Sequence, residues 1–224
     1  MTLKTTSRLA GFAFLFYIAI GIYDMALFGR ASAGEGAAAM LANVARHATQ
    51  IRISSLLELL MALCALTIAV TIYSITRGYD RELALLAMVC RVVEGANGAR
   101  GAIARMQLLS VATAAQQASG PDAAAANALG LMFMGNNVAV SAILFAVGST
   151  IYCYIFLRGR VIPRPMAWLG CLSSLLLVIA LPAQVVLATT GGWLVWIPMA
   201  LFEVALAVWL LVKGAAPAAT APAR

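Results

Sequence analysis

Charged side chains are scarce in this sequence. Asp, Glu, Lys and Arg make up only 10% of its 224 residues, whereas 63% are hydrophobic. A water-soluble globular protein of this size exposes more polar surface than these residues can supply. The scarcity of charge therefore excludes an ordinary soluble fold and predicts that most of the chain lies in an apolar surrounding.

Residues that bind metals and cofactors are also few. His47 is the one histidine, and a lone histidine outside the apolar segments builds neither a multi-histidine metal centre nor a haem site. The four cysteines form no Cys-x-x-Cys pair, so we expect small buried side chains rather than disulfides or redox centres. Glycine-rich phosphate loops and nucleophile elbows are absent as well. The sequence therefore predicts no metal and no cofactor.

Long apolar runs are abundant, and a membrane-spanning helix needs roughly 20 mostly apolar residues. We predict one all-α transmembrane domain over residues 1–214, a six-helix bundle, followed by a disordered cytoplasmic tail at 215–224, which is rich in alanine and proline. The first run also resembles a cleavable secretory signal, but it is longer than the usual signal core and carries Asp24, which favours a span. The predicted spans are Leu9–Phe28, Ile51–Ile75, Leu83–Ser110, Leu129–Leu157, Pro165–Ala188 and Trp193–Val212.

The net charge of +7 does not indicate nucleic-acid binding, because the basic residues form no stripe on the chain. They lie beside the ends of the spans and predict how the chain is oriented in the membrane. Most of them fall on the side that holds both termini, which predicts that both termini are cytoplasmic. The residues on that side are Lys4, Arg8, Arg77, Arg81, Arg158, Arg160, Arg164 and Lys213. The predicted outer loops are then Gly29–Gln50, Val111–Ala128 and Thr189–Gly192.

The first outer loop contains an amphipathic pattern. In Glu35–Gln50, apolar residues recur at helical spacing between polar ones, as in a helix that lies on a membrane surface. Such a helix could cover the outer mouth of the bundle. An outward extension of the second span explains the same pattern equally well.

Ionisable residues inside spans are costly, so they normally face the bundle interior and indicate function. Counting about 1.5 Å per residue from the predicted span ends places Glu58, Glu203 and Asn136 at one level in the outer half, with Arg91 and Glu94 below them. Arg100 is expected to point away from the others. The candidate catalytic residues are Glu94, Glu203, Glu58 and Arg91, and the candidate ligand-binding residues are Asn136, Asn137, Arg105, Asp24 and Trp196.

One face of the third predicted span carries most of this chemistry. At about 100° per residue, Arg91, Glu94, Gly98, Gly101 and Arg105 share that face, and its glycines also permit close helix approach. The charges could therefore be an ion network that only holds helices in register. Because acidic residues outnumber arginines at this depth, at least one carboxyl group is expected to lack a partner. Burial favours its neutral form, which can donate a proton.

Several short motifs resemble the bacterial membrane family called domain of unknown function 4386. They are Arg8–Gly11, Cys90–Glu94, Phe156–Arg158, Ile162–Arg164 and Glu203–Gly214, so the likeness covers nearly the whole chain. Cys90 stands where that family commonly has phenylalanine. The resemblance implies a six-span inner-membrane protein and directs attention to Arg91, Glu94 and Glu203, but it implies no substrate.

The sequence is compatible with three functions. The leading hypothesis is a site that binds a small lipophilic molecule, or converts it by metal-independent acid–base chemistry of the isomerase or cyclase type, with Glu94 or Glu203 as the acid. The others are a proton-coupled carrier and a structural subunit whose charges only pack helices. Expected partners are membrane lipids and the small molecule, with no nucleic acid, and the sequence does not indicate an oligomeric state.

Overall fold

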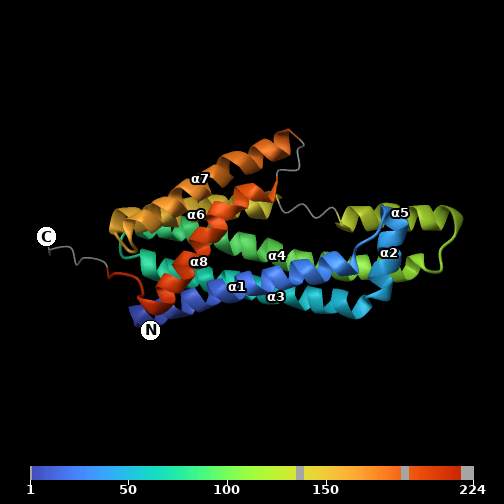
Figure 1. The fold of residues 1–224 in the computed structure, drawn as a ribbon, viewed down its shortest axis with the longest axis horizontal. Helices are drawn as coiled ribbons and strands as arrows, with labels where there is room; N and C mark the ends of the chain where they lie inside the picture. Colours follow the sequence, from blue (N-terminus) through green and yellow to red (C-terminus); the bar gives the residue numbers. More distant parts are fainter. Residues whose placement is uncertain (1, 135–138, 188–191, 218–224) are drawn as a thin grey trace. The chain divides into compact units, whose positions relative to one another are not determined.

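The computed structural model describes residues 2–134, 139–187 and 192–217, and every regular element in them is a helix (Figure 1). In chain order the helices are α1 (Leu3–Ala31), α2 (Gly36–Arg46), α3 (Ala48–Thr76), α4 (Arg81–Ala115), α5 (Gly120–Met134), α6 (Ala139–Gly159), α7 (Arg164–Val186), the 3-10 turn η1 (Trp193–Trp196) and α8 (Ile197–Val212). The all-α class predicted from the apolar runs is confirmed.

Five helical segments of the described residues are long and apolar enough to cross a membrane. They are α1, α3, α6 from Val140 onward, α7, and the run Trp193–Val212 that joins η1 to α8. The predicted span Leu83–Ser110 lies within α4, which is 35 residues long and carries Arg91, Glu94, Arg100 and Arg105. The chain is thus an all-α multi-pass membrane protein.

The helices extend beyond several predicted boundaries. The outer loop predicted over 111–128 is instead helical up to Ala115 and again from Gly120, because alanine is the best helix former and continues a helix past its apolar run. The predicted span Leu129–Leu157 corresponds to the end of α5 and most of α6, and residues 135–138 between them lie outside the described part.

The chain divides into two compact units. Unit 1 comprises Met1–Tyr17, Cys64–Gly95 and Ala139–Arg224, and unit 2 comprises Ile18–Leu63 and Ala96–Val138. Helices α1, α3 and α4 each contribute residues to both units. The two units are considered separately below.

The larger apolar core belongs to unit 1. In it α6 packs against α7, and α7 packs against α8 (Figure 1). Gly170 on α7 permits the close approach, since a Cβ there would lie 2.6 Å from both the Cys153 Sγ atom on α6 and the Phe202 ring on α8. Gly11 on α1 plays the same role against α8, where a Cβ would lie 2.5 Å from the carbonyl oxygen of Ala207.

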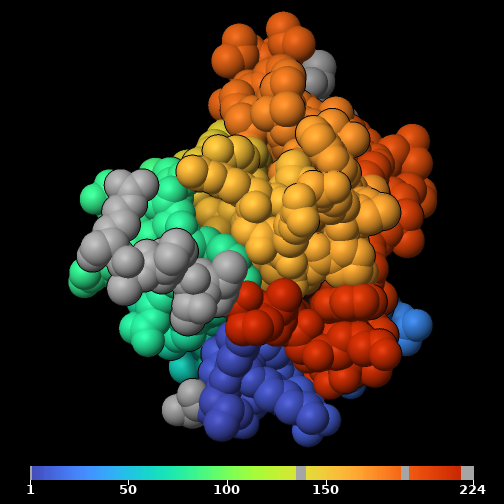
Figure 2. Space-filling view, turned by 90° about the vertical axis from the view of Figure 1, so that its left-hand side faces the viewer, coloured from blue at the N-terminus to red at the C-terminus, as the bar shows by residue number. Residues whose placement is uncertain are grey.

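Four separate segments meet at one end of unit 1 (Figure 2). The Ala215 N–H donates to Ser7 Oγ at 3.1 Å, the Ala216 N–H donates to the Val161 carbonyl at 2.9 Å, and the Tyr79 hydroxyl donates to the Ala216 carbonyl at 2.8 Å. The chain start, the α3–α4 and α6–α7 connections and the residues after α8 therefore lie together. We call this the basic end, because Lys4, Arg8, Arg77, Arg81, Arg158, Arg160, Arg164 and Lys213 lie in these segments. Of the predicted tail, residues 218–224 lie outside the described part.

Unit 2 contains the amphipathic helix that the sequence predicts. Helix α2 ends at Arg46, with His47 as its cap, so it is a helix of its own and not an extension of α3. Its apolar residues Leu41 and Val44 are buried in a small core. Gly130 on α5 lies against Leu41, which shows how closely α2 packs on α5 (Figure 1).

Candidate functional site

The buried charges form two networks, one in each unit. Arg91 and Glu94 lie in the part of α4 that belongs to unit 1, and Arg105 lies in the part that belongs to unit 2. Each arginine is accompanied by two acidic residues. The sequence placed all of these groups in a single set, so their division between the two units is a correction.

The unit 1 network is centred on Arg91. Its Nη1 atom lies 2.7 Å from Oε2 of Glu94, and the two side chains are adjacent because residues three apart lie one turn apart on a helix. Arg91 is 2% exposed and Glu94 8%. Glu203 on α8 interacts electrostatically with both. Unit 1 thus brings together Arg91, Glu94 and Glu203, the residues to which the family resemblance directs attention.

Aromatic side chains complete the surroundings of Arg91. The Arg91 Cζ atom lies 4.8 Å from the centre of the Phe145 ring, close enough for a cation–π interaction. Trp196 packs on the same phenylalanine, with ring centres 6.0 Å apart. The predicted ligand-binding Trp196 is therefore connected to Arg91 through Phe145.

The hydrogen-bonding capacity of the unit 1 network is only partly used. The Nε and Nη1 atoms of Arg91 and Oε2 of Glu94 are buried, and no described residue is placed to form a hydrogen bond with them. Nη1 and Oε2 are close enough for an ion pair but not aligned for a hydrogen bond. Leaving a buried polar group unsatisfied costs about 1–3 kcal/mol, and more when it is charged. This network is therefore open to a further polar partner.

The unit 2 network joins α1, α3 and α4 through Arg105. Its Nη1 atom donates to both carboxylate oxygens of Asp24, at 2.8 and 2.7 Å, and its Nη2 atom lies 2.7 Å from Oε1 of Glu58. Ser54 Oγ donates to Asp24 at 2.6 Å and also contacts the arginine. The Phe28 ring lies 4.5 Å from Arg105 Cζ.

This second network is closed. None of the buried side-chain nitrogen or oxygen atoms of Asp24, Ser54, Glu58 or Arg105 lacks a hydrogen-bond partner. Asp24 is only 4% exposed, yet its carboxylate is fully engaged. A closed, satisfied network of this kind holds helices together, whereas the open one in unit 1 keeps two unused donor atoms and one unused acceptor atom.

The two glycines of the predicted α4 face differ. A Cβ on Gly101 would lie 3.3 Å from the Glu58 carboxyl carbon, so this glycine makes room for the glutamate. A Cβ on Gly98 would meet no atom within 4 Å. Of the two, only Gly101 therefore permits close approach.

The remaining predicted residues are placed as follows. Arg100 is exposed, as its angular position on the helix predicts. Asn136 and Asn137 lie outside the described residues. Within the described part, no three His, Cys, Asp or Glu side chains gather in a way that could hold a metal ion.

Sequence reasoning missed several partners of these charges. Phe145, Ser149 and Tyr152 recur at helical spacing on α6, and two polar residues on one stripe of an apolar helix could have indicated a face toward Arg91. Ser54 lies one turn before Glu58, and Phe28 lies one turn after Asp24. The sequence shows the spacing within each of these pairs, but no pattern in it predicts that Arg105 contacts them.

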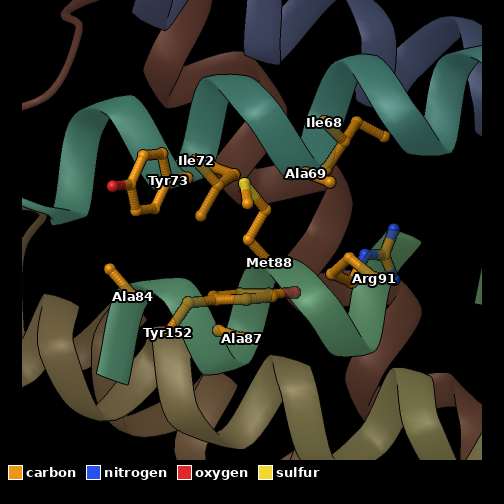
Figure 3. Close-up of a pocket in the computed structure, with 9 residues that line it drawn as sticks. All are labelled: Ile68, Ala69, Ile72, Tyr73, Ala84, Ala87, Met88, Arg91 and Tyr152. Carbon is orange, nitrogen blue, oxygen red and sulfur yellow. The ribbon is translucent and has the colours of Figure 1, made fainter. Parts of the chain in front are cut away.

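A small cavity adjoins the Arg91 network. It has a volume of about 10 Å³, lies in unit 1 and is lined by Arg91, Tyr152 and neighbouring residues of α3 and α4 (Figure 3). Unit 2 contains a wide-open depression of about 400 Å³ between the end of α4 and the start of α5, where alanines alternate with Val111, Leu129, Gln117 and Asp122. Neither arginine network lines this depression.

Comparison with known proteins identifies a family but no characterised relative. A model of the family described as domain of unknown function (DUF4386) matches residues 9–214. No curated protein and no solved structure matches the chain.

Proposed function

Because the chain belongs to the family of domain of unknown function 4386, we propose a function from its two charge networks. The proposal is a six-span inner-membrane protein that binds a small lipophilic molecule at Arg91, Glu94 and Glu203. In this proposal the unit 1 network is the binding site. The Asp24–Arg105–Glu58 network of unit 2 holds helices in place.

Two observations support the proposed topology. At about 1.5 Å per residue, the 35 residues of α4 exceed the roughly 30 Å of a hydrocarbon core, so this helix is long enough to be the sixth span. The chain start and the residues after α8 meet at the basic end of unit 1. Basic residues collect on the cytoplasmic side, so we infer that both termini are cytoplasmic.

One observation carries the binding proposal. Arg91 is almost completely buried, and two of its nitrogen atoms have no hydrogen-bond acceptor among the described residues. Two carboxyl groups, of Glu94 and Glu203, share this one guanidinium group. A small molecule with a polar oxygen would use the spare donors of Arg91, and its apolar part would suit the surrounding hydrocarbon.

The same geometry suggests how the site could act on such a molecule. Glu94 is paired with Arg91 at 2.7 Å, so its negative charge is compensated, whereas Glu203 forms no ion pair within 4.0 Å among the described residues. We propose that Glu203 carries the proton and donates it, or a hydrogen bond, to the bound oxygen. Arg91 would hold Glu94 and orient the oxygen.

The test is mass spectrometry of small molecules and lipids that remain bound after gentle extraction, compared with bulk membrane lipid. The wild-type protein is expected to retain one enriched lipophilic species. Replacing both acids, with Glu94→Leu and Glu203→Leu, removes the proposed hydrogen-bond donor together with the charge that holds Arg91, and it is expected to abolish the enrichment. Arg100→Gln, which changes an exposed arginine on the same helix, is the control and should retain it. If the wild-type protein retains nothing specific, and the double variant matches it in thermal stability and bound lipids, the proposal is wrong.

A proton-coupled carrier is the second candidate. It is favoured by the presence of two carboxyl groups for each buried arginine in both units, since surplus carboxyl groups can carry protons. The threonines of the inner half of α3 do not support it, because Thr71 donates to backbone carbonyls of its own helix. A pH-dependent flux of solute in proteoliposomes, lost in Glu203→Gln, would favour the carrier over the binding protein.

A further inference from the structure

The small cavity in unit 1 lies on one particular side of Arg91. Its lining residues on α4 run from Arg91 back to Ala84, and those on α3 run forward to Tyr73 (Figure 3). Ala84 and Tyr73 each lie about one turn from the segment that connects α3 to α4. The cavity therefore extends from Arg91 toward the basic end of unit 1.

The polar atoms at one end of this cavity are suitably placed for a small polar guest. Figure 3 shows the Tyr152 hydroxyl and the Arg91 side chain close together at one end, with the Tyr73 ring at the other. Tyr152 is 1% exposed, and its hydroxyl donates to Ser149 Oγ at 2.9 Å, which leaves its oxygen able to accept. The buried Nε of Arg91 remains able to donate.

The volume of the cavity restricts which molecule it can hold. A water molecule needs a cavity of about 10–15 Å³ on this measure together with two to four polar partners, and dry cavities in proteins are lined by apolar groups alone. The volume here is about 10 Å³, and the lining includes both a guanidinium and a phenol. A lipid tail or a polyatomic anion is too large.

We propose that this cavity is a hydration site in which one water molecule binds between the Arg91 guanidinium group and the Tyr152 hydroxyl. The water accepts a hydrogen bond from Arg91 and donates one to Tyr152. It supplies an exchangeable proton beside the buried ion pair, on the side that faces the basic end. The hydration site does not depend on the lipophilic ligand proposed above, because it uses the Nε atom of Arg91 and leaves the Nη1 atom for that ligand.

The proposal can be tested by brief X-ray radiolysis of the purified full-length protein, with hydroxyl-radical labelling read by mass spectrometry. Radicals form from nearby water, so a buried side chain is labelled rapidly only when a water lies beside it. Tyr152 and the buried cavity residue Ile68 are expected to label severalfold faster than Phe156, which is equally buried on α6 but lines no cavity.

Two variants make the test specific. Ala69→Val fills the cavity and should lower labelling of Tyr152 and Ile68 severalfold, while Phe156 stays unchanged. Ala65→Val is the matched control, because Ala65 is a buried alanine one turn away on α3 that does not line the cavity. Tyr152→Phe keeps the volume but removes the acceptor, and it should slow labelling of Ile68 even if Ala69→Val fails to fold. Slow labelling of Tyr152 in the wild-type protein, or rapid labelling of Ile68 that neither Ala69→Val nor Tyr152→Phe changes, would overturn the hydration site.

Discussion

Arg91 and Arg105 lie on one helix and both meet carboxyl groups, but they differ in how fully their hydrogen bonds are used. Arg105 bonds to Asp24 and Ser54 and pairs with Glu58, whereas two nitrogen atoms of Arg91 have no acceptor among the described residues. Removing one partner of a buried ion pair is costly, because the remaining charge stays buried without compensation. The two arginines should therefore respond differently to substitution.

Arg105→Gln is expected to destabilise the protein strongly. The change leaves the buried Asp24 carboxylate without its cation, and breaking such a pair costs about 3–5 kcal/mol. Thermal unfolding in detergent measures the effect as a fall in Tm. The control is Arg100→Gln, which removes an exposed charge five residues away and should change stability by no more than about 0.5 kcal/mol. Equal Tm values for the two variants would show that the network contributes nothing.

At the residue scale, the sequence predicts which charges are buried better than it predicts their partners. The i, i+3 spacing of Arg91 and Glu94 places them on one turn, and the structure confirms that they pair. Glu58 was assigned by depth to the level of Glu203, but it pairs with Arg105. Depth follows from counting residues along a helix. The choice of partner depends on how α3 rotates about its own axis, and that rotation is set by packing rather than by spacing.

At the element scale, glycines decide which helices approach closely. Gly11→Ala is expected to destabilise the protein by about 1–3 kcal/mol, because the new methyl group would lie 2.5 Å from a backbone oxygen of α8 that cannot move independently. Gly29→Ala on the same helix is the matched control, since a Cβ there meets no atom within 4 Å. It should be neutral or stabilise by about 0.5–1 kcal/mol. Chemical denaturation compares the two, and an equal loss of stability would contradict the close packing of α1 on α8.

The residues after α8 are held by Tyr79, and this gives a pH-dependent prediction. Burial raises the pKa of the Tyr79 phenol, which lies in the α3–α4 connection outside the spans. The neutral phenol is the donor to Ala216, so its contribution is complete below the ordinary tyrosine pKa and is lost as the pH rises through the raised value. Carboxypeptidase digestion of the wild-type protein should slow at Ala216 at neutral pH and proceed past it at strongly alkaline pH.

Tyr79→Phe should remove this protection at every pH. Tyr154→Phe, at an exposed tyrosine on α6, serves as the control and should digest like the wild-type protein. If Tyr79→Phe and the wild-type protein digest at the same rate, the contact does not restrain the segment.

Which elements exist was predictable, but where some of them end was not. Apolar runs predicted α3, α7 and the Trp193–Val212 run to within about three residues, because a span needs a fixed length of apolar sequence. Helix α1 starts at Leu3, before the predicted Leu9, because helical residues precede its apolar run. Hydropathy alone missed the extension of α4 to Ala115 and the start of α5 at Gly120. These segments are helical through their alanines and not through their hydropathy.

At the scale of the whole molecule, the proposed topology predicts how the chain is oriented in the membrane. With six spans, both termini and the basic end lie in the cytoplasm. A fluorescent protein that matures only in the cytoplasm should be bright when fused to either terminus, and a periplasm-dependent phosphatase should be inactive at both. Opposite results at the two termini would mean an odd number of spans and would exclude α4 or another helix as a crossing segment.

We infer that the open network of unit 1 serves function and that the closed network of unit 2 serves stability. Measuring bound lipophilic molecules and Tm together in two charge-removing variants, Glu203→Leu and Asp24→Asn, tests this division. We predict that Glu203→Leu, which removes the proposed hydrogen-bond donor, loses the bound molecule with Tm unchanged or raised. We predict that Asp24→Asn, whose carboxylate accepts from Ser54 and Arg105 in the wild-type protein, lowers Tm while the folded fraction still retains the molecule. Loss of the molecule only in Asp24→Asn, or a large fall in Tm only in Glu203→Leu, would contradict this division of roles.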